Sequence, residues 1–216
     1  DKWNQHELAE IAFQAERLQL GIAGGWQDQY AAVFGGFNFI EFHADENIVS
    51  PIRLQSDIAL ELEESLVLCD TGIDHHSGNI HDHQKETMAS ESVLKMVKKN
   101  VELTYSTRKY LLRGDLIKFG ECLDASWKLK RNFSSMISND YLDMIYNGAI
   151  ENGALGGKLL GAGGGGYFIF YVSPFEKHNL MTYLASQNLT IQPFRFEPDG
   201  LKAWTSRDNK NKRIEE

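Results

Sequence analysis

Apolar residues recur every three or four positions near the start of the chain, which is the spacing of one face of a helix. The pattern therefore predicts an amphipathic helix, and Gly21 is a suitable residue to end it. Such a face needs a partner surface that covers it in the folded protein. The stripe consists of Leu8, Ile11, Ala12, Ala15 and Leu18.

Two strand-like runs follow a short helix-like segment over residues 24–34. Apolar and polar positions alternate over 37–42, a polar turn occupies 45–47, and a second run extends over 48–54. This order predicts an antiparallel hairpin.

The remainder of the chain alternates between strand-like and helical patterns. A helical region over 77–131 divides at Gly114 and Asp115, where a glycine ends one helix and an aspartate caps the next. The pattern predicts strands over 60–69, 167–172 and 190–196, and helices from Asn139 or Asp140 to Asn152 and from Ser173 through Ser186.

The order of elements after residue 57, with strands separated by helices behind a hairpin, predicts an α+β fold in two layers. At 216 residues, the chain is long enough for one ordinary domain or two small ones. Its 42% hydrophobic and 24% charged residues are the balance of a globular protein with a real core. Residues 206–216 mix both signs of charge and read as a solvated tail.

Charge and composition exclude several classes of function. The formal net charge of −8 argues against a nucleic-acid partner, because phosphate backbones select basic surfaces. No apolar run approaches the roughly 18 residues of a membrane helix, so we expect no membrane partner. Cys69 and Cys122 do not make a disulfide framework, which favours a cytoplasmic protein. Because the chain opens on Asp1 rather than Met, we expect it to be the carboxy-terminal part of a longer protein.

The richest motif is the glycine loop, residues 161–166, with five glycines in six positions ahead of an apolar strand. Glycine permits positive φ angles and lets an anion approach backbone N–H groups. A turn needs only one or two glycines, so the surplus favours a phosphate site over simple turn chemistry. A dinucleotide fingerprint is rejected because the loop precedes a strand, and a Walker loop over 153–158 is rejected because Leu159 replaces its Ser or Thr.

Two carboxylates form a second candidate constellation. Glu16 lies in the first helix, and Asp28 follows twelve positions later, beyond a glycine-bearing turn. Phosphoryl transfer needs one carboxylate for Mg²⁺ and another that faces the attacking hydroxyl. Taken alone, Glu16 also fits a solvated helix residue, and Asp28 fits a carboxylate at a helix N-terminus.

Two motifs together resemble the GHMP sugar and isoprenoid kinases. Gly25-Trp26-Gln27-Asp28-Gln29-Tyr30 and the stretch from Gly157 through Gly166 are similar to the later motifs of this family, in the same order. The similarity extends to about Trp204 and is greatest with the D-glycero-D-manno-heptose 7-phosphate kinases. It implies the end of an N-terminal, ribosomal protein S5 domain 2-like domain over 1–57, a ferredoxin-like C-terminal domain over 58–205 and a tail over 206–216.

The resemblance also implies roles for particular residues, with ATP and Mg²⁺ as cofactors and a sugar phosphate as the small-molecule partner. Asp28 matches the catalytic carboxylate that faces the anomeric hydroxyl, and Glu16 matches the magnesium ligand. Lys158 adds positive charge or is a surface lysine. The implied substrate- and phosphate-binding residues are Gly24, Gly25, Gln27, Tyr30, Lys158, Gly161, Gly163, Gly164, Gly165 and Gly166.

Two features depart from the family pattern, and the family pattern leaves a third feature unassigned. The Pro-x-x-x-Gly-Leu-x-Ser-Ser-Ala phosphate loop does not occur in these residues, so we expect the chain by itself to be inactive. Trp26 stands where a basic residue is expected. The histidines His75, His76, His81 and His83 form either a metal site or, as their spacing favours, a loop that is exposed or lies at the edge of the substrate.

The implied activity is transfer of the γ-phosphate of ATP to the anomeric hydroxyl of D-glycero-D-manno-heptose 7-phosphate, towards nucleotide-activated heptose. The alternatives are a kinase of the same family that acts on another sugar, such as fucose or galactose, and a catalytically dead module that binds sugar phosphate. The uncovered apolar stripe of the first helix also predicts self-association, so a homo-oligomer is an open alternative.

Overall fold

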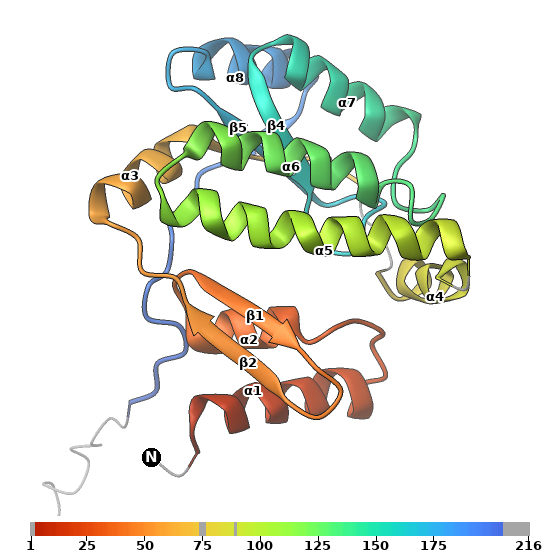
Figure 1. The fold of residues 1–216 in the computed structure, drawn as a ribbon. Helices are drawn as coiled ribbons and strands as arrows, with labels where there is room; N and C mark the ends of the chain where they lie inside the picture. The colour runs from red at the N-terminus through yellow and green to blue at the C-terminus, as the bar shows by residue number, and fades with distance from the viewer. Residues whose placement is uncertain (1–2, 74–76, 89, 205–216) are drawn as a thin grey trace, which may run out of the picture.

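The computed structural model describes residues 3–73, 77–88 and 90–204 (Figure 1). The predicted tail over 206–216, together with His75 and His76, lies outside these residues. The helices are α1 (Gln5–Phe13), the π-helix η1 (Gln14–Gln19), α2 (Gln27–Phe34), α3 (Ser56–Ser65), α4 (Ser77–Thr87), α5 (Glu91–Leu112), α6 (Leu116–Lys130), α7 (Asp140–Glu151) and α8 (Lys177–Ser186). The strands are β1 (Asn38–Phe42), β2 (Asn47–Pro51), β3 (Leu66–Asp70), β4 (Ala154–Leu159), β5 (Tyr167–Val172) and β6 (Thr190–Gln192).

The first unit packs α1 and α2 against the hairpin of β1 and β2, which is antiparallel as predicted (Figure 1). Asn4 and Glu7 form a capping box that starts α1. Ala9, Tyr30 and Val33 make the small core of the unit, so part of the predicted apolar stripe finds its partner surface in α2. Leu18 stays exposed.

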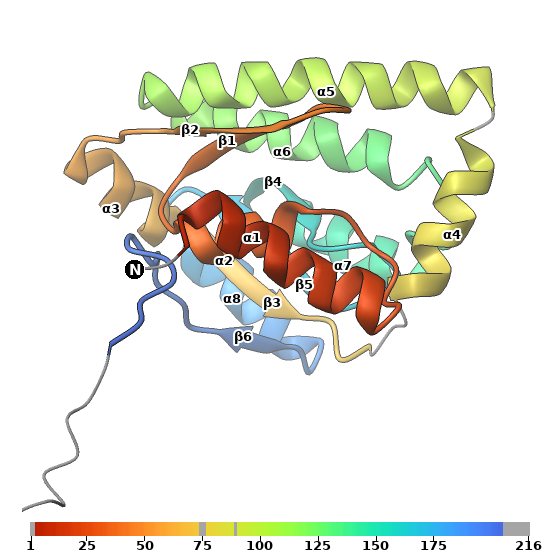
Figure 2. The ribbon, with the colours of Figure 1, turned by 90° about the horizontal axis from the view of Figure 1, so that it is seen from below.

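The second unit is an antiparallel sheet in the order β4-β5-β3-β6. Alternation along β5 divides its side chains between two cores: Phe168 and Phe170 pack with α7 and α8, whereas Tyr171 packs with α3 and the start of α6. Figure 2 shows the helices around this sheet, with α4 at one end. The mixed sheet-and-helix architecture confirms the predicted α+β class.

Two sets of contacts join the units. Two residues of α5 contact the ring of Phe39 on the hairpin. The ring centroids of Tyr105 and Phe39 are 5.2 Å apart, and Arg108 Cζ lies 4.5 Å from the centroid of the Phe39 ring. The segment after β6 returns to the first unit, where Gly36 N–H donates to the carbonyl of Glu197 at 2.7 Å. None of the described helices has the length and apolar character needed to cross a membrane.

Several predicted boundaries were wrong. Residues 60–69 are not one strand: the helix α3 continues to Ser65, because Ile58 and Leu62 lie at helical spacing on one core, and β3 begins only at Leu66. The closing strand ends at Gln192 rather than at 196, since Pro193 has no N–H for the ladder. The strand β4 was not predicted, and the helical region over 77–131 has an additional division between α4 and α5.

Candidate active site

The two predicted acids meet at one guanidinium group. Asp28 lies in the first turn of α2, and Glu16 lies in η1. Between them is Arg17, whose Nη2 lies 3.5 Å from Asp28 Oδ2 and whose Nη1 lies 3.3 Å from Glu16 Oε1. The side chain of Asp28 is 69% exposed, so its carboxylate is open to solvent. Both carboxylates therefore contact the same guanidinium group, and their roles in a reaction stay a prediction.

Gln29 fixes the second carboxylate of this pair. Its side chain is buried, and its Nε2 donates to Glu16 Oε2 at 2.5 Å. Neither Gln29 nor Arg17 was among the predicted site residues. The signal that could have found them is their adjacency to the two acids, since Arg17 follows Glu16 and Gln29 follows Asp28.

The turn before α2 is shaped around Arg17. A Cβ atom added at Gly24 would lie 2.4 Å from Arg17 Cζ, whereas one added at Gly25 meets nothing within 4 Å. Trp26 stacks on Phe13 with ring centroids 3.5 Å apart, which ties the turn to α1. The tryptophan that replaces an expected basic residue is therefore a packing residue in this structure.

The other two predicted site residues of α2, Gln27 and Tyr30, differ in their exposure to solvent. Gln27 is exposed at the first position of the helix. Tyr30 is buried, donates its hydroxyl to Glu10 Oε1 at 2.6 Å and accepts from Asn47 Nδ2 at 3.0 Å. Burial and the bond to Glu10 raise the pKa of Tyr30. Because its hydroxyl is engaged in the core, Tyr30 is not part of the site that we propose.

The glycine loop is held to two neighbouring segments. Gly164 N–H donates to Ile137 O at 2.8 Å, and Gly166 N–H donates to Ile73 O at 3.0 Å. Thr71 Oγ1 donates to Gly166 O at 2.7 Å. The N–H groups of Gly164 and Gly166, which were expected to bind an anion, therefore donate hydrogen bonds within the chain.

The surplus of glycines has a structural cause. A Cβ at Gly163 would lie 2.9 Å from Ile137 Cα, and one at Gly165 would lie 2.5 Å from Ile73 O. Positive φ angles occur at Gly161, Gly163, Gly164 and Gly166. The premise that one or two glycines suffice here was therefore wrong: close packing and backbone conformation require most of them.

Two lysines flank the start of the glycine loop. Lys158 is half-buried on β4, and burial lowers the pKa of its ammonium group. Lys130, at the end of α6, donates to Gly161 O at 2.5 Å and lies 3.4 Å from Leu159 O. Burial and the charge of Lys158 lower the pKa of Lys130 to about 7. Lys130 was not predicted, because its place beside the loop depends on how α6 packs on β4.

We expect the replacement of Lys158 by methionine to raise the pKa of Lys130, because the variant lacks a neighbouring positive charge. The folded pKa of Lys130 lies below the unfolded value near 10.5, so the unfolded state binds more protons between about pH 7 and 10.5. Stability attributable to Lys130 therefore rises with pH in that window. NMR titration of lysine side chains measures the pKa of Lys130 in each variant. The control variant is Lys95→Met, which removes an exposed lysine that pairs with Glu91. An unchanged Lys130 pKa in Lys158→Met contradicts the expectation.

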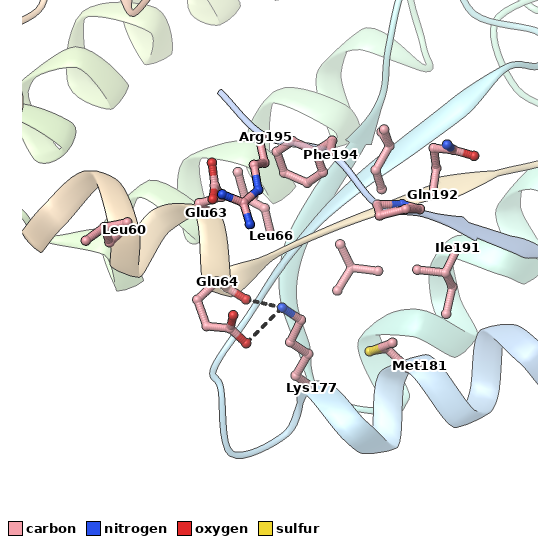
Figure 3. Close-up of a pocket in the computed structure, with 13 residues that line it drawn as sticks. Leu60, Glu63, Glu64, Leu66, Lys177, Met181, Ile191, Gln192, Phe194 and Arg195 are labelled. Carbon is pink, nitrogen blue, oxygen red and sulfur yellow. Dashed lines mark hydrogen bonds and ion pairs between the residues drawn. The ribbon is translucent and has the colours of Figure 1, made fainter. Parts of the chain in front are cut away.

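Among the described residues, no hydrogen bond or ion pair joins Asp28 to the glycine loop, so their convergence on one substrate stays a prediction. A cavity of about 760 Å³ lies elsewhere, beside the edge of β3 where β6 ends (Figure 3). Lys177 and Glu64 form an ion pair at its mouth with a separation of 3.0 Å. This cavity contains none of the predicted site residues.

The histidine cluster is only partly described. His83 Nδ1 lies 2.7 Å from Ser134 Oγ, which ties α4 to the segment before α7. In the part of the chain that the structure describes, no group of three or more His, Cys, Asp or Glu residues is arranged to hold a metal. The metal alternative for the four histidines therefore gains no support from His83.

Comparison with known proteins gives matches over both units. The D-glycero-alpha-D-manno-heptose 7-phosphate kinase of Campylobacter jejuni is 40% identical over 201 residues, which cover 93% of this chain and 59% of that kinase. A solved structure described as a sugar kinase from Campylobacter jejuni matches with a TM-score of 0.71 at 38% identity, over 94% of this chain and 58% of that one. The solved structure of a D-glycero-D-manno-heptose 1-phosphate kinase from Bacteroides thetaiotaomicron matches with a TM-score of 0.70 at 30% identity. This match covers 95% of this chain and 57% of that kinase.

The chain thus spans about three fifths of the length of these relatives. More distant relatives are fucokinases and a galactokinase. The family of GHMP kinases N terminal domains matches residues 1–36, which hold the acidic pair, and the family of GHMP kinases C terminal domains matches residues 107–187, which hold the glycine loop. The two matches follow the order that the motifs predicted, and the chain belongs to the GHMP kinase family.

Proposed function

We propose that the protein containing this chain transfers the γ-phosphate of ATP to the anomeric hydroxyl of D-glycero-D-manno-heptose 7-phosphate. The observation that carries the proposal is the convergence of Glu16 and Asp28 on Arg17, in a chain 40% identical to a heptose 7-phosphate kinase. An exposed carboxylate beside a second carboxylate is the arrangement that phosphoryl transfer to an alcohol requires. The product is a sugar 1-phosphate of the kind used for nucleotide activation.

Asp28 acts as the base in this proposal. The O–H bond of the anomeric hydroxyl breaks, and its proton passes to the carboxylate of Asp28. The sugar oxygen forms a bond to the γ-phosphorus, while the bond from that phosphorus to the β–γ bridging oxygen breaks and ADP leaves. The exposure of Asp28 leaves room for a sugar on its outer side.

Glu16 is the residue that we propose as a ligand of the divalent cation. Mg²⁺ in such sites is bound by one or two carboxylates together with substrate phosphates, and a single half-exposed glutamate suits that donor set. When bound, the ion offsets the negative charge of the nucleotide. Gln29 donates a hydrogen bond to Oε2 of Glu16, and Arg17 forms an ion pair with Oε1, so these two residues orient the carboxylate.

The glycine loop and Lys158 are proposed to line the phosphate side of the cleft, with Gly24, Gly25 and Gln27 at the sugar side. The two lysines support this division, because Lys130 and Lys158 place two basic side chains at the start of the loop, where a bound phosphate would favour their protonated forms. The phosphate-loop motif of the family does not occur in these 216 residues, so the proposal concerns the protein that contains this chain.

The proposal predicts a substrate preference. With ATP and Mg²⁺, the protein that contains this chain should release ADP with heptose 7-phosphate at a kcat/KM at least about tenfold above that with fucose or galactose. Background ATP hydrolysis without sugar is the control. A preference for fucose or galactose contradicts the heptose assignment and favours the second enzyme alternative; binding of heptose 7-phosphate without ADP release favours the catalytically dead module.

A further inference from the structure

Arg17 is a buried cation in an otherwise open site. Its side chain is 9% exposed, although Asp28 and Glu16 beside it are 69% and 40% exposed. Its Nη1 donates to the carbonyl oxygen of Ala23 at 3.3 Å, in the turn before α2. A single guanidinium therefore holds η1, the turn over 20–26 and the first turn of α2 together.

Glu16 and Arg17 lie in a π-helical turn, η1. The π-helical hydrogen bond runs from Leu20 N–H to Ala15 O, and Ile22 N–H, in the turn after η1, donates to Glu16 O. Turns of this kind are rare and recur at functional sites.

Gly24 leaves the space that the guanidinium fills. Its missing Cβ would lie 2.4 Å from Arg17 Cζ and 2.5 Å from Arg17 Nη1. Without the arginine, two carboxylates would face each other across this space with no cation between them, which is unfavourable for both. The burial of Arg17, the two carboxylates and the glycine are thus interdependent.

We propose that Arg17 is a positioning residue, whose guanidinium fixes the direction of the Asp28 carboxylate and holds Glu16 beside it. The catalytic meaning of this role rests on the proposed function, since it assumes that Asp28 faces the reacting hydroxyl. The positioning itself concerns only the contacts of Arg17. An aligned carboxylate matters because a misplacement of about 1 Å costs roughly 10²-fold in rate.

The test uses three variants of the protein that contains this chain: Arg17→Met removes the cation, Arg17→Lys keeps the charge, and Gly24→Ala leaves the arginine but fills its space. Arg108→Met, at an arginine that packs over Phe39, is the matched control. Amide hydrogen exchange over residues 20–28 should become at least tenfold faster in Arg17→Met and in Gly24→Ala, and not in the control.

The kinetic readout separates positioning from general stability. In Arg17→Met we expect kcat to fall about 10²-fold, while the KM for sugar changes less than threefold. The kcat of Arg17→Lys should recover part of this loss. The kcat of Gly24→Ala should lie between those of the wild type and Arg17→Met. Exchange and kcat within twofold of wild type in both Arg17→Met and Gly24→Ala overturn the proposal. If wild-type protein phosphorylates no sugar, the proposed function fails, and the exchange measurement still decides whether Arg17 holds this turn.

Discussion

Replacement of Asp28 by asparagine is expected to lower kcat for sugar phosphorylation by about 10²–10⁴-fold, which is the usual contribution of a general base. Asparagine keeps the size of the side chain and its place in the first turn of α2, but it cannot accept the hydroxyl proton at neutral pH. Because Asp28 is 69% exposed and contributes little to packing, the melting temperature should change by less than about 2 °C. ADP release under saturating ATP measures the effect.

The matched control is Asp45→Asn, an exposed aspartate in the turn between β1 and β2. It removes the same charge from the first unit and should leave kcat within twofold. An Asp28→Asn variant that turns over like wild type would end the base assignment, whatever its effect on stability.

The glycine loop gives the second large effect. Gly163→Ala should destabilise the protein by about 2–4 kcal/mol, because φ at this position is +117° and the new Cβ would lie 2.9 Å from the backbone of Ile137. The loop can make room only by moving away, which lengthens the 2.8 Å bond from Gly164 N–H to Ile137 O. Denaturant unfolding of the wild type and the variant measures this difference in free energy.

Gly161→Ala is the control within the same loop. Its φ of +66° is the left-handed conformation, but a Cβ there meets nothing within 4 Å. The cost should therefore be about 1 kcal/mol, which is the backbone term alone. Equal losses at the two positions would mean that the contact with Ile137 does not constrain the loop.

Elements with a strong local signal could be predicted from the sequence. The hairpin of β1 and β2 has an alternating run before a polar turn and an apolar run after it, and α7 has both a cap at Asn139 and an apolar face. Local pattern and tertiary packing agree in these segments, so either one suffices to predict them.

The missed elements depend on packing that local pattern does not show. In β4, Gly156 and Gly157 have poor strand propensity, but a Cβ at Gly156 would lie 2.0 Å from Gly120 O of α6. That close approach of helix and strand is the reason for the glycine and cannot be read from the strand itself. In α3, the helical spacing of Ile58 and Leu62 merges with the apolar run of β3, and the boundary at Ser65 disappears in the pattern.

The two acids and Lys158 of the candidate site could be proposed from the sequence, but Arg17 and Lys130 could not. Glu16 and Asp28 could be found by their motif and by the family resemblance. The contacts of Arg17 depend on how η1 lies against the first turn of α2, and those of Lys130 depend on the placement of the end of α6 against the glycine loop. Both cations gain their contacts from tertiary geometry: adjacency to Glu16 is the one sequence signal for Arg17, and Lys130 has no such signal.

The convergence of Asp28 and the glycine loop on one substrate is tested most directly by a crystal structure of the protein that contains this chain, with heptose 7-phosphate and a non-hydrolysable ATP analogue bound. We predict the carboxylate of Asp28 within about 3.2 Å of the anomeric oxygen, and the backbone of Gly163 lining the same cleft. A sugar bound with Asp28 turned away from its anomeric carbon, or bound in the cavity between Leu60 and Lys177, would contradict the assignment.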